Sequence, residues 1–180
     1  MKDRGSIITQ RPDDVPEAEL GAFLAAHGLH VTTVESCTGG GIAQALTRIP
    51  GSSGWFEQGL VTYSNEAKSR LAGVDPGIIE RYGAVSRETV CAMAQGGLTS
   101  SGADLAIAVS GIAGPGGGTP DKPVGSVWTA VAGRGVGTEA VLSRFDGDRD
   151  TVRARTVAFA LELALKMARR IVAETGHKET

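Results

Sequence analysis

The sequence is poor in several residue types, and each shortage excludes a class of protein. Only two of its 180 residues are cysteines, Cys37 and Cys91, and their spacing is not that of a disulfide framework. Aromatic residues make up only 4% of the chain, but hydrophobic residues as a whole make up 41%. The composition therefore excludes a small disulfide-stapled fold and a disordered chain, and it favours a reducing compartment.

Long hydrophobic runs and a strong charge of either sign are also missing. No apolar run approaches the roughly 20 residues that a membrane-spanning helix needs. The polar start, Met1 to Gln10, lacks the apolar core of a signal peptide. A net charge of −2 gives no electrostatic basis for a broad nucleic-acid or membrane surface. We therefore expect a soluble cytoplasmic protein with no nucleic-acid and no membrane partner.

The order of apolar segments predicts the fold class. Strand-like and helix-like segments alternate and a hairpin follows, which predicts an α/β protein: a three-layer α/β/α sandwich with a mixed, mostly parallel sheet. We expect a flexible tail at 1–14 and a single domain at 15–174. The predicted strands are 30–34, 59–63, 104–109, 125–131 and 138–145. The predicted helices are 16–28, 41–49, 66–71, 75–82, 87–99 and 148–173.

The stretch from Val31 to Gly41 is the strongest candidate for chemistry. Four β-favouring residues lead into Glu35 and Ser36, and a glycine run then opens a helix. This order places the Ser36 hydroxyl at the end of a strand, beside a helix N-terminus. The first N–H groups of a helix have no partner inside it, so they are able to bind an anion or a developing oxyanion. Ser36 is therefore the candidate nucleophile.

A serine nucleophile needs a base, and histidine does not supply one here. His27, His30 and His177 all lie outside the glycine-rich segments. Lys68 is the alternative, on condition that its pKa is lowered from about 10.4 to roughly 7–8. It follows Tyr63 by five residues, so both side chains could face the same cleft. Spacing alone, however, favours an exposed lysine and a core tyrosine.

Cys37 is the rival nucleophile. A thiol is intrinsically more nucleophilic than an alcohol, but Cys37 has no evident histidine partner. A structural role for Cys37 is the better interpretation. Glu35, on the other side of Ser36, either polarises the site or hydrogen-bonds the backbone.

Two later segments are candidates for anion binding. The run from Ser110 to Gly125 holds six glycines and three prolines, and with Thr119 and Lys122 it could cradle a phosphate or an oxyanion. Composition alone fits a mobile loop equally well. Arg149 begins the last predicted helix and could grip a phosphate bidentately. For Arg153, one turn later, a solvated ion pair is as good an interpretation. No cluster has metal-ligand spacing, so we expect no metal and no cofactor.

Three ordered blocks carry a family resemblance. Glu35 to Gly40, Thr62 to Asn65 with Lys68, and Ser110 to Gly125 resemble the CinA C-terminal domain family over about 15–173. Enzymes of this family are nicotinamide-nucleotide amidohydrolases of NAD metabolism, active in the pyridine nucleotide cycle. The resemblance implies the same α/β/α fold and a metal-independent deamidation of nicotinamide mononucleotide, a small-molecule nucleotide, to nicotinic acid mononucleotide and ammonia.

The resemblance also implies roles for individual residues. Ser36 would be the nucleophile and Lys68, with Tyr63, the base, which reverses the preference drawn from spacing. The implied substrate-binding residues are Glu35, Thr38, Gly39, Gly40, Ser110, Gly111, Gly114, Thr119 and Arg149. The oxyanion would be held by N–H groups near Thr38 to Gly40 or at Ser110-Gly111. Two alternatives stay open: a non-catalytic nucleotide-binding or partner-interaction domain, and an amidase for another small amide. A homo-oligomer is possible.

Overall fold

The computed structural model describes residues 16–175, with side chains described to residue 174. The tail expected at 1–14 lies outside the described residues. Five strands form one sheet in the order β2-β1-β3-β4-β5. Their bounds are β1 Val31–Glu35, β2 Phe56–Val61, β3 Leu105–Gly111, β4 Ser126–Gly133 and β5 Gly137–Arg144.

The sheet is mixed, as the sequence predicts, but a parallel majority is not confirmed. β1 pairs in parallel with β2 and with β3, whereas β3–β4 and β4–β5 are antiparallel. The reason lies in the connections. Parallel neighbours need a crossover, usually a helix, and the segment between β3 and β4 contains no helix. The chain therefore turns back beside β3 in the opposite direction.

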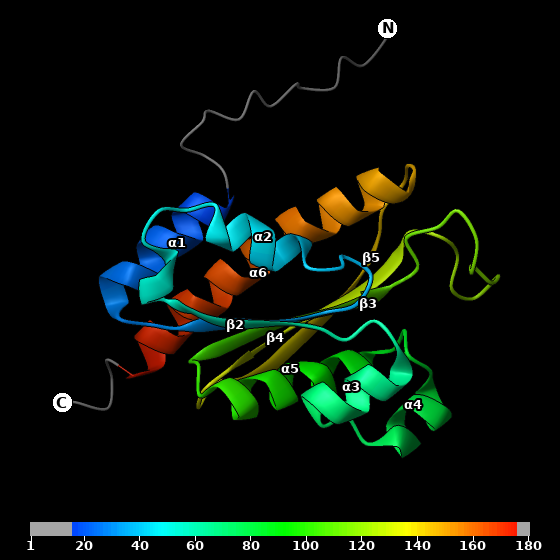
Figure 1. Ribbon diagram of the computed structural model, residues 1–180, viewed down its shortest axis with the longest axis horizontal. Helices are drawn as coiled ribbons and strands as arrows, with labels where there is room; N and C mark the ends of the chain where they lie inside the picture. Colours follow the sequence, from blue (N-terminus) through cyan, green and yellow to red (C-terminus); the bar gives the residue numbers. More distant parts are fainter. Residues whose placement is uncertain (1–15, 176–180) are drawn as a thin grey trace, which may run out of the picture.

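All six predicted helices are present, and they pack on this sheet. α1 Pro16–His27, α2 Gly41–Thr47 and α6 Arg149–Thr175 lie on one face (Figure 1). α3 Asn65–Ala72, α4 Pro76–Tyr82 and α5 Arg87–Ser101 lie on the other. The segment before β2 contains a short 3₁₀ turn, Ser52–Gly54. None of the helices between residues 16 and 175 combines the length and the apolar character needed to cross a bilayer.

Local sequence fixes where the helices on the lower face in Figure 1 begin. The Ser64 hydroxyl accepts the Ala67 N–H at 3.0 Å, and the Ser86 hydroxyl accepts the Thr89 N–H at 3.2 Å. These are N-caps, which satisfy backbone donors that a helix leaves without partners. The cap at Ser64 matters for function, because it places Lys68 one turn into α3.

The sheet separates two hydrophobic clusters. Val31, Ile107 and Val131 face α1, α2 and α6. Val34 and Ala108 point to the other side, where they meet α5. β1 is buried along its whole length, and β3 is buried from Leu105 to Ser110. The residues of β3 from 105 to 109 are all apolar because this strand is buried. Burial of β1 and β3 holds the carboxyl ends of both strands in fixed positions.

Gly96 lets α5 approach α3 closely, and it gives a stability prediction. A Cβ added at Gly96 would lie 1.7 Å from the backbone oxygen of Ala72. We therefore expect Gly96→Ala to lower the free energy of unfolding by about 3 kcal/mol, because backbone has to move to relieve the clash. Gly54→Ala is the matched control, since a Cβ there meets nothing within 4 Å. Urea denaturation of both variants measures the difference, and equal midpoints would contradict the close packing of α5 on α3.

Candidate active site

The candidate site lies where the carboxyl ends of β1 and β3 meet. From β1 the chain crosses through α2 on one face to β2, and from β2 it crosses through α3, α4 and α5 on the other face to β3. Such a reversal is where open α/β sheets bind ligands. The Ser36 N–H donates to Val109 O at 3.1 Å, which joins the two strand ends. A cavity of about 210 Å³ opens there. It is lined by Ser36, Cys37, Tyr63, Asn65, Lys68, Ala84, Val85, Ser110, Gly111, Ala113 and Arg149.

Ser36 and Lys68 are in direct contact within this cavity. Lys68 Nζ lies 3.2 Å from Ser36 Oγ, 3.0 Å from Thr62 O and 3.5 Å from Tyr63 O. Side chains of a helix lean toward its N-terminus, so Lys68 on α3 reaches back to the end of β1. The base and nucleophile named in the sequence analysis, 32 residues apart, are therefore brought together.

Lys68 is held without a counter-ion. Only 2% of the residue is exposed, and within residues 16–175 no carboxylate forms an ion pair with it. Loss of solvation lowers the pKa of Lys68 below the ordinary value of 10.5, while nearby Cys37 opposes the shift. The environment thus favours the neutral amine, which is the form that accepts a proton.

The thiol of Cys37 has the opposite tendency. Burial, assisted by the charge of Glu35, raises the pKa of Cys37 to about 11, although its own N–H and that of Thr38 act to lower it. At neutral pH the thiol is protonated and 6% exposed. Of the two neighbouring nucleophiles, only Ser36 has a base at hydrogen-bond distance.

Glu35 does not face the cavity. Its carboxylate accepts the Thr38 hydroxyl at 2.6 Å. It also accepts the N–H groups of Gly40, Ile42 and Ala43 at 3.1, 2.9 and 2.8 Å. Of the two interpretations of Glu35, the structure shows the hydrogen bonds to backbone. They also occupy donors at the N-terminus of α2, which the sequence analysis assigned to an anion.

Two further N–H groups of the turn at residues 36–41 donate to carbonyls within the same turn. Gly39 N–H donates to Ser36 O at 3.0 Å, and Gly41 N–H donates to Thr38 O at 3.2 Å. The donors expected at Gly39 and Gly40 are therefore already used. Among residues 16–175, the N–H groups of Cys37 and Thr38 have no oxygen acceptor. They are candidate donors to an oxyanion at Ser36, although both also interact with the Cys37 sulfur, and the alternative at Ser110-Gly111 stays a prediction.

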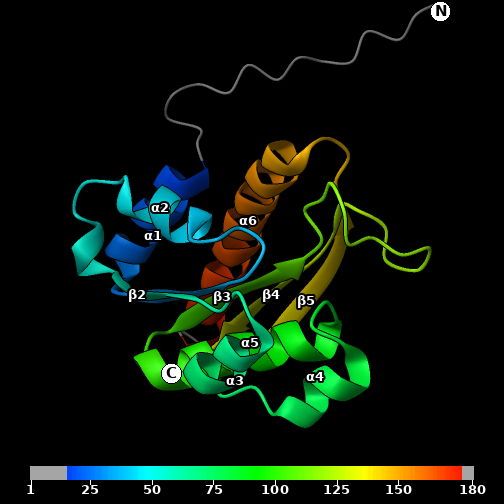
Figure 2. The same ribbon diagram turned by 45° about the vertical axis from the view of Figure 1, so that its right-hand side comes forward.

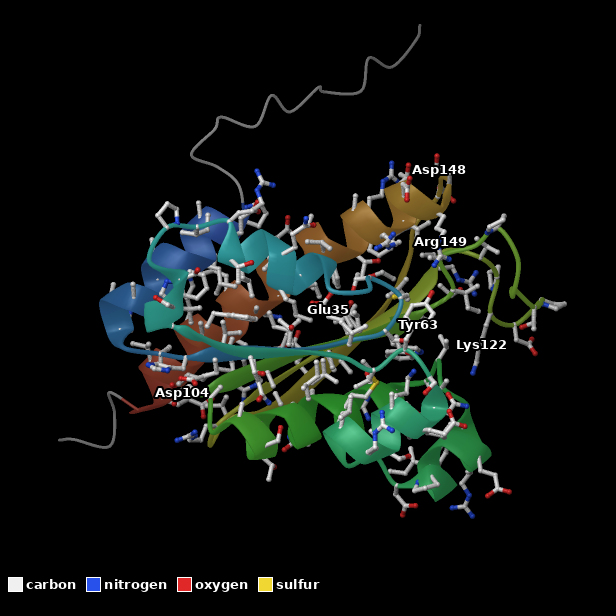
Figure 3. The ribbon with its side chains drawn as sticks, in the orientation of Figure 1. Glu35, Tyr63, Asp104, Lys122, Asp148 and Arg149 are labelled. Atoms are coloured by element: carbon white, nitrogen blue, oxygen red, sulfur yellow. The ribbon has the colours of Figure 1, made fainter. Side chains whose placement is uncertain are left out.

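Tyr63 and Arg149 meet at the mouth of the cavity. Arg149 donates from Nη2 to the Tyr63 hydroxyl and from Nη1 to Gly114 O, each at 2.9 Å. Figure 3 shows the two side chains at the same edge of the molecule. Tyr63 is 58% exposed and offers Lys68 its carbonyl, while its phenol contacts Arg149. Lys68 thus contacts Ser36 directly, while the Tyr63 phenol lies against Arg149.

The glycine-rich segment after β3 divides into two parts. Ser110 and Gly111 line the cavity, and the Ser110 hydroxyl donates to Ala84 O at 2.7 Å. The part that follows projects from the body of the protein (Figures 1 and 2). Thr119 lies in this part, where its hydroxyl accepts the Lys122 N–H at 3.1 Å, and it does not line the cavity. Thr119 thus lies outside the cavity lining, and its assignment to the binding residues stays a prediction.

Several lining residues were not identified from the sequence. Ala84 and Val85 come from the connection between α4 and α5, which carries no chemical signal. Lys122 Nζ donates to Val85 O at 2.8 Å and so fastens this connection to the glycine-rich segment. Asn65 ends the block Thr62 to Asn65 but was given no role at the site, although its place three residues before Lys68 was a usable signal.

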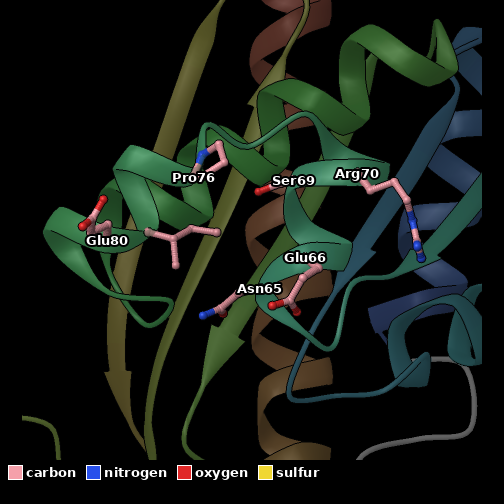
Figure 4. Close-up of a pocket in the computed structure, with 7 residues that line it drawn as sticks. Asn65, Glu66, Ser69, Arg70, Pro76 and Glu80 are labelled. Carbon is pink, nitrogen blue, oxygen red and sulfur yellow. The ribbon is translucent and has the colours of Figure 1, made fainter.

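A larger groove of about 730 Å³ lies outside this site, between α3 and α4 (Figure 4). Its lining has charges of both signs and one hydroxyl but neither lysine nor histidine: Asn65, Glu66, Ser69, Arg70, Pro76, Ile79 and Glu80. Asn65 is the residue it shares with the Ser36 cavity. Size alone does not make it catalytic: its lining includes the carboxylates of Glu66 and Glu80, but among the described residues neither forms a hydrogen bond with the Ser69 hydroxyl. In the described part of the chain, no group of three or more His, Cys, Asp or Glu residues is arranged to hold a metal ion.

Comparison with known proteins identifies the family of this chain. The profile of the CinA C-terminal domain matches residues 13–168. Nicotinamide-nucleotide amidohydrolase PncC of Enterobacter agglomerans is 52% identical over 148 residues, which cover 82% of this chain and 90% of that protein. PncC of Escherichia coli K12 is 51% identical, over 80% of this chain and 87% of that protein. The crystal structure of the competence/damage-inducible protein CihA from Agrobacterium tumefaciens superposes with a TM-score of 0.83 at 44% identity, covering 84% of this chain and 93% of that one. The chain thus belongs to the CinA C-terminal domain family.

Proposed function

We propose that the protein is a nicotinamide-nucleotide amidohydrolase that uses Ser36 as nucleophile and Lys68 as base. The substrate is nicotinamide mononucleotide, and the products are nicotinic acid mononucleotide and ammonia. The observation that carries the proposal is the 3.2 Å contact between Lys68 Nζ and Ser36 Oγ in a cavity at the strand ends. The identity to PncC enzymes supports the substrate.

The contacts of Lys68 suit a neutral amine. A neutral amine has two N–H donors and one lone pair. The carbonyls of Thr62 and Tyr63 accept the two donors, and the lone pair is then directed at the Ser36 hydroxyl. In this arrangement the Ser36 proton moves to Lys68 as Oγ attacks the carboxamide carbon.

The remaining steps return this proton. Lys68, now protonated, gives the proton to the departing nitrogen, so that ammonia leaves and an ester forms on Ser36. A water molecule then gives its proton to Lys68 and attacks the ester carbon. The acid product leaves as Ser36 recovers its proton. The negative charge on the carbonyl oxygen in both steps is stabilised by the N–H groups of Cys37 and Thr38.

The size of the cavity indicates which part of the substrate it encloses. About 210 Å³ is below the roughly 300–1,000 Å³ typical of sites that enclose a whole drug-sized ligand. The nicotinamide ring therefore occupies the cavity, and the ribose phosphate extends to its mouth. There Arg149 binds the phosphate through its paired N–H donors, with Tyr63 beside it.

Ammonia release from nicotinamide mononucleotide tests the proposal, and Arg149 tests the orientation of the substrate. We expect Arg149→Ala to raise KM for the mononucleotide about 10- to 100-fold, because a hydrogen bond between charged groups is lost. Nicotinamide riboside, which lacks the phosphate, is the matched control and should be hydrolysed equally by both proteins. An equal loss on both substrates would contradict the phosphate assignment, and no ammonia from the wild type would overturn the substrate.

A further inference from the structure

Arg153 reaches the turn that carries Ser36 from the side opposite to the catalytic cavity. It lies on α6, and its Nη2 donates to Thr38 O at 2.9 Å. Arg153 lines a separate groove of about 390 Å³ between α1, α2 and α6, whose lining includes neither Ser36 nor Lys68. The guanidinium therefore contacts the back of the turn and not the space where the carboxamide reacts.

The peptide groups of this turn depend on contacts for their orientation. Gly39 and Gly40 have φ angles of +59° and +96°, in the left-handed region where glycine is unstrained and other residues are not. Glycine is also free to leave that region, so the local sequence does not lock these peptides. What locks them is the set of hydrogen bonds that surrounds the turn.

These bonds also determine where the N–H groups of Cys37 and Thr38 point. Ser36 C=O accepts the Gly39 N–H, and in a trans peptide the N–H of Cys37 points the opposite way from that carbonyl. Thr38 is fixed by Glu35 at its hydroxyl, and by Gly41 and Arg153 at its carbonyl. Of these contacts on Thr38, Arg153 is the one that comes from outside the segment 35–43.

We propose that Arg153 is a positioning residue. By holding the Thr38 carbonyl it fixes the Thr38–Gly39 peptide, whose N–H bonds the Ser36 carbonyl, and it thereby keeps the N–H groups of Cys37 and Thr38 directed at the oxyanion that forms on attack by Ser36. The inference rests on the proposed function of Ser36 and extends it to a residue that does not touch the substrate. Arg153 contacts both the turn and solvent-exposed Asp150: Nη2 is bonded to Thr38 O, and Nη1 lies 3.9 Å from Asp150 Oδ1. Within residues 16–175 its Nε is buried and has no hydrogen-bond partner, so the stem of the guanidinium is enclosed beside the turn.

The test compares Arg153→Ala with the wild type. We expect kcat for ammonia release to fall about 10- to 100-fold, somewhat less than the loss of an oxyanion donor itself, with KM within about 3-fold. Because the groove beside Arg153 is open to solvent, added guanidinium at a non-denaturing concentration should restore part of kcat. Arg155→Ala, two residues along the same helix at an exposed position, is the matched control and should behave as wild type.

A second measurement separates this inference from the choice of substrate. A fluorophosphonate probe reacts with an activated serine and forms a similar oxyanion, so Ser36 labelling, followed by intact mass, does not need the nucleotide. We expect Arg153→Ala to slow labelling by a factor similar to the loss in kcat, and guanidinium to restore it. If the wild type is labelled but releases no ammonia, the proposed substrate is wrong and the labelling rates still test Arg153.

Three results would overturn the inference. A raised KM with unchanged kcat would make Arg153 a phosphate ligand. Unchanged labelling would show that the turn does not need it. A loss that guanidinium cannot reverse in a protein of unchanged melting temperature would also count against it.

If Arg153→Ala melts below the assay temperature, Arg153→Lys replaces it. Lysine keeps the charge and the stem of arginine but not its planar fork, and wild-type kcat in that variant would overturn the inference.

Discussion

Replacement of Ser36 by alanine is expected to lower kcat for ammonia release roughly 10⁴-fold or more, the size of effect seen when a catalytic nucleophile is removed. Within residues 16–175 the other groups at hydrogen-bond distance from Lys68 Nζ are backbone carbonyls, so no other side chain replaces the hydroxyl. Binding of the nucleotide should persist within a few-fold, because Arg149 and the cavity wall are unchanged. Ammonia release and calorimetric titration with nicotinic acid mononucleotide measure the two quantities.

Ser69→Ala is the matched control for this variant. Ser69 is the next residue after Lys68, but it lines the groove between α3 and α4 and not the Ser36 cavity. Its removal should leave kcat unchanged. Ammonia release that survives in Ser36→Ala would refute the nucleophile, and the same assay on Cys37→Ala would then show whether the thiol carries the reaction.

Replacement of Lys68 by methionine is expected to abolish activity and to stabilise the protein at neutral pH. The rate should fall about 10³-fold, within the range for loss of a general base. Stability should rise, because methionine fills similar space without the cost of burying an amine that has no counter-ion. Thermal melting and ammonia release on the same preparations show both effects, and Lys166→Met, at an exposed position, is the matched control.

The lowered pKa of Lys68 also predicts the direction of two pH dependences. Activity of the wild type should rise with pH through this pKa, since the base must be neutral. Between the pKa in the folded protein and the ordinary value, the unfolded chain binds more protons, so the stability of the wild type also rises with pH. The advantage of Lys68→Met should therefore be largest below the lowered pKa and shrink above it. A constant difference between the two melting temperatures would contradict the shift.

Much of the site could be predicted from local sequence signals. The β-favouring run followed by glycine placed Ser36 at a strand end, and the cap at Ser64 placed Lys68 one turn into a helix. Both signals involve residues close together in the sequence, so the sequence alone is enough to predict them. The resemblance of the three blocks then paired Ser36 with Lys68, which their spacing alone did not favour.

The contacts that could not be predicted join distant segments. Glu35 pairs with Val61 across β1 and β2, and this register brings the Thr62 and Tyr63 carbonyls to Lys68. No local pattern specifies that register. The contact of Arg149 with the Tyr63 hydroxyl, 86 residues away, likewise depends on how α6 packs. The sequence left two interpretations of Glu35, polarising the site or hydrogen-bonding the backbone, and only the geometry of the turn shows the backbone hydrogen bonds.

The buried carboxylate of Glu35 has a consequence for how this protein tolerates change. It accepts four donors spread over residues 38–43, all of which reach one side chain. A substitution at position 35 therefore removes the hydrogen-bond acceptor of several residues at once. Replacement of Thr38 removes one of the donors to the Glu35 carboxylate. Residues 35–43 must vary together or hardly at all, so a library aimed at new amide substrates would best leave this block intact and diversify the cavity wall at Ala84, Val85 and Ala113.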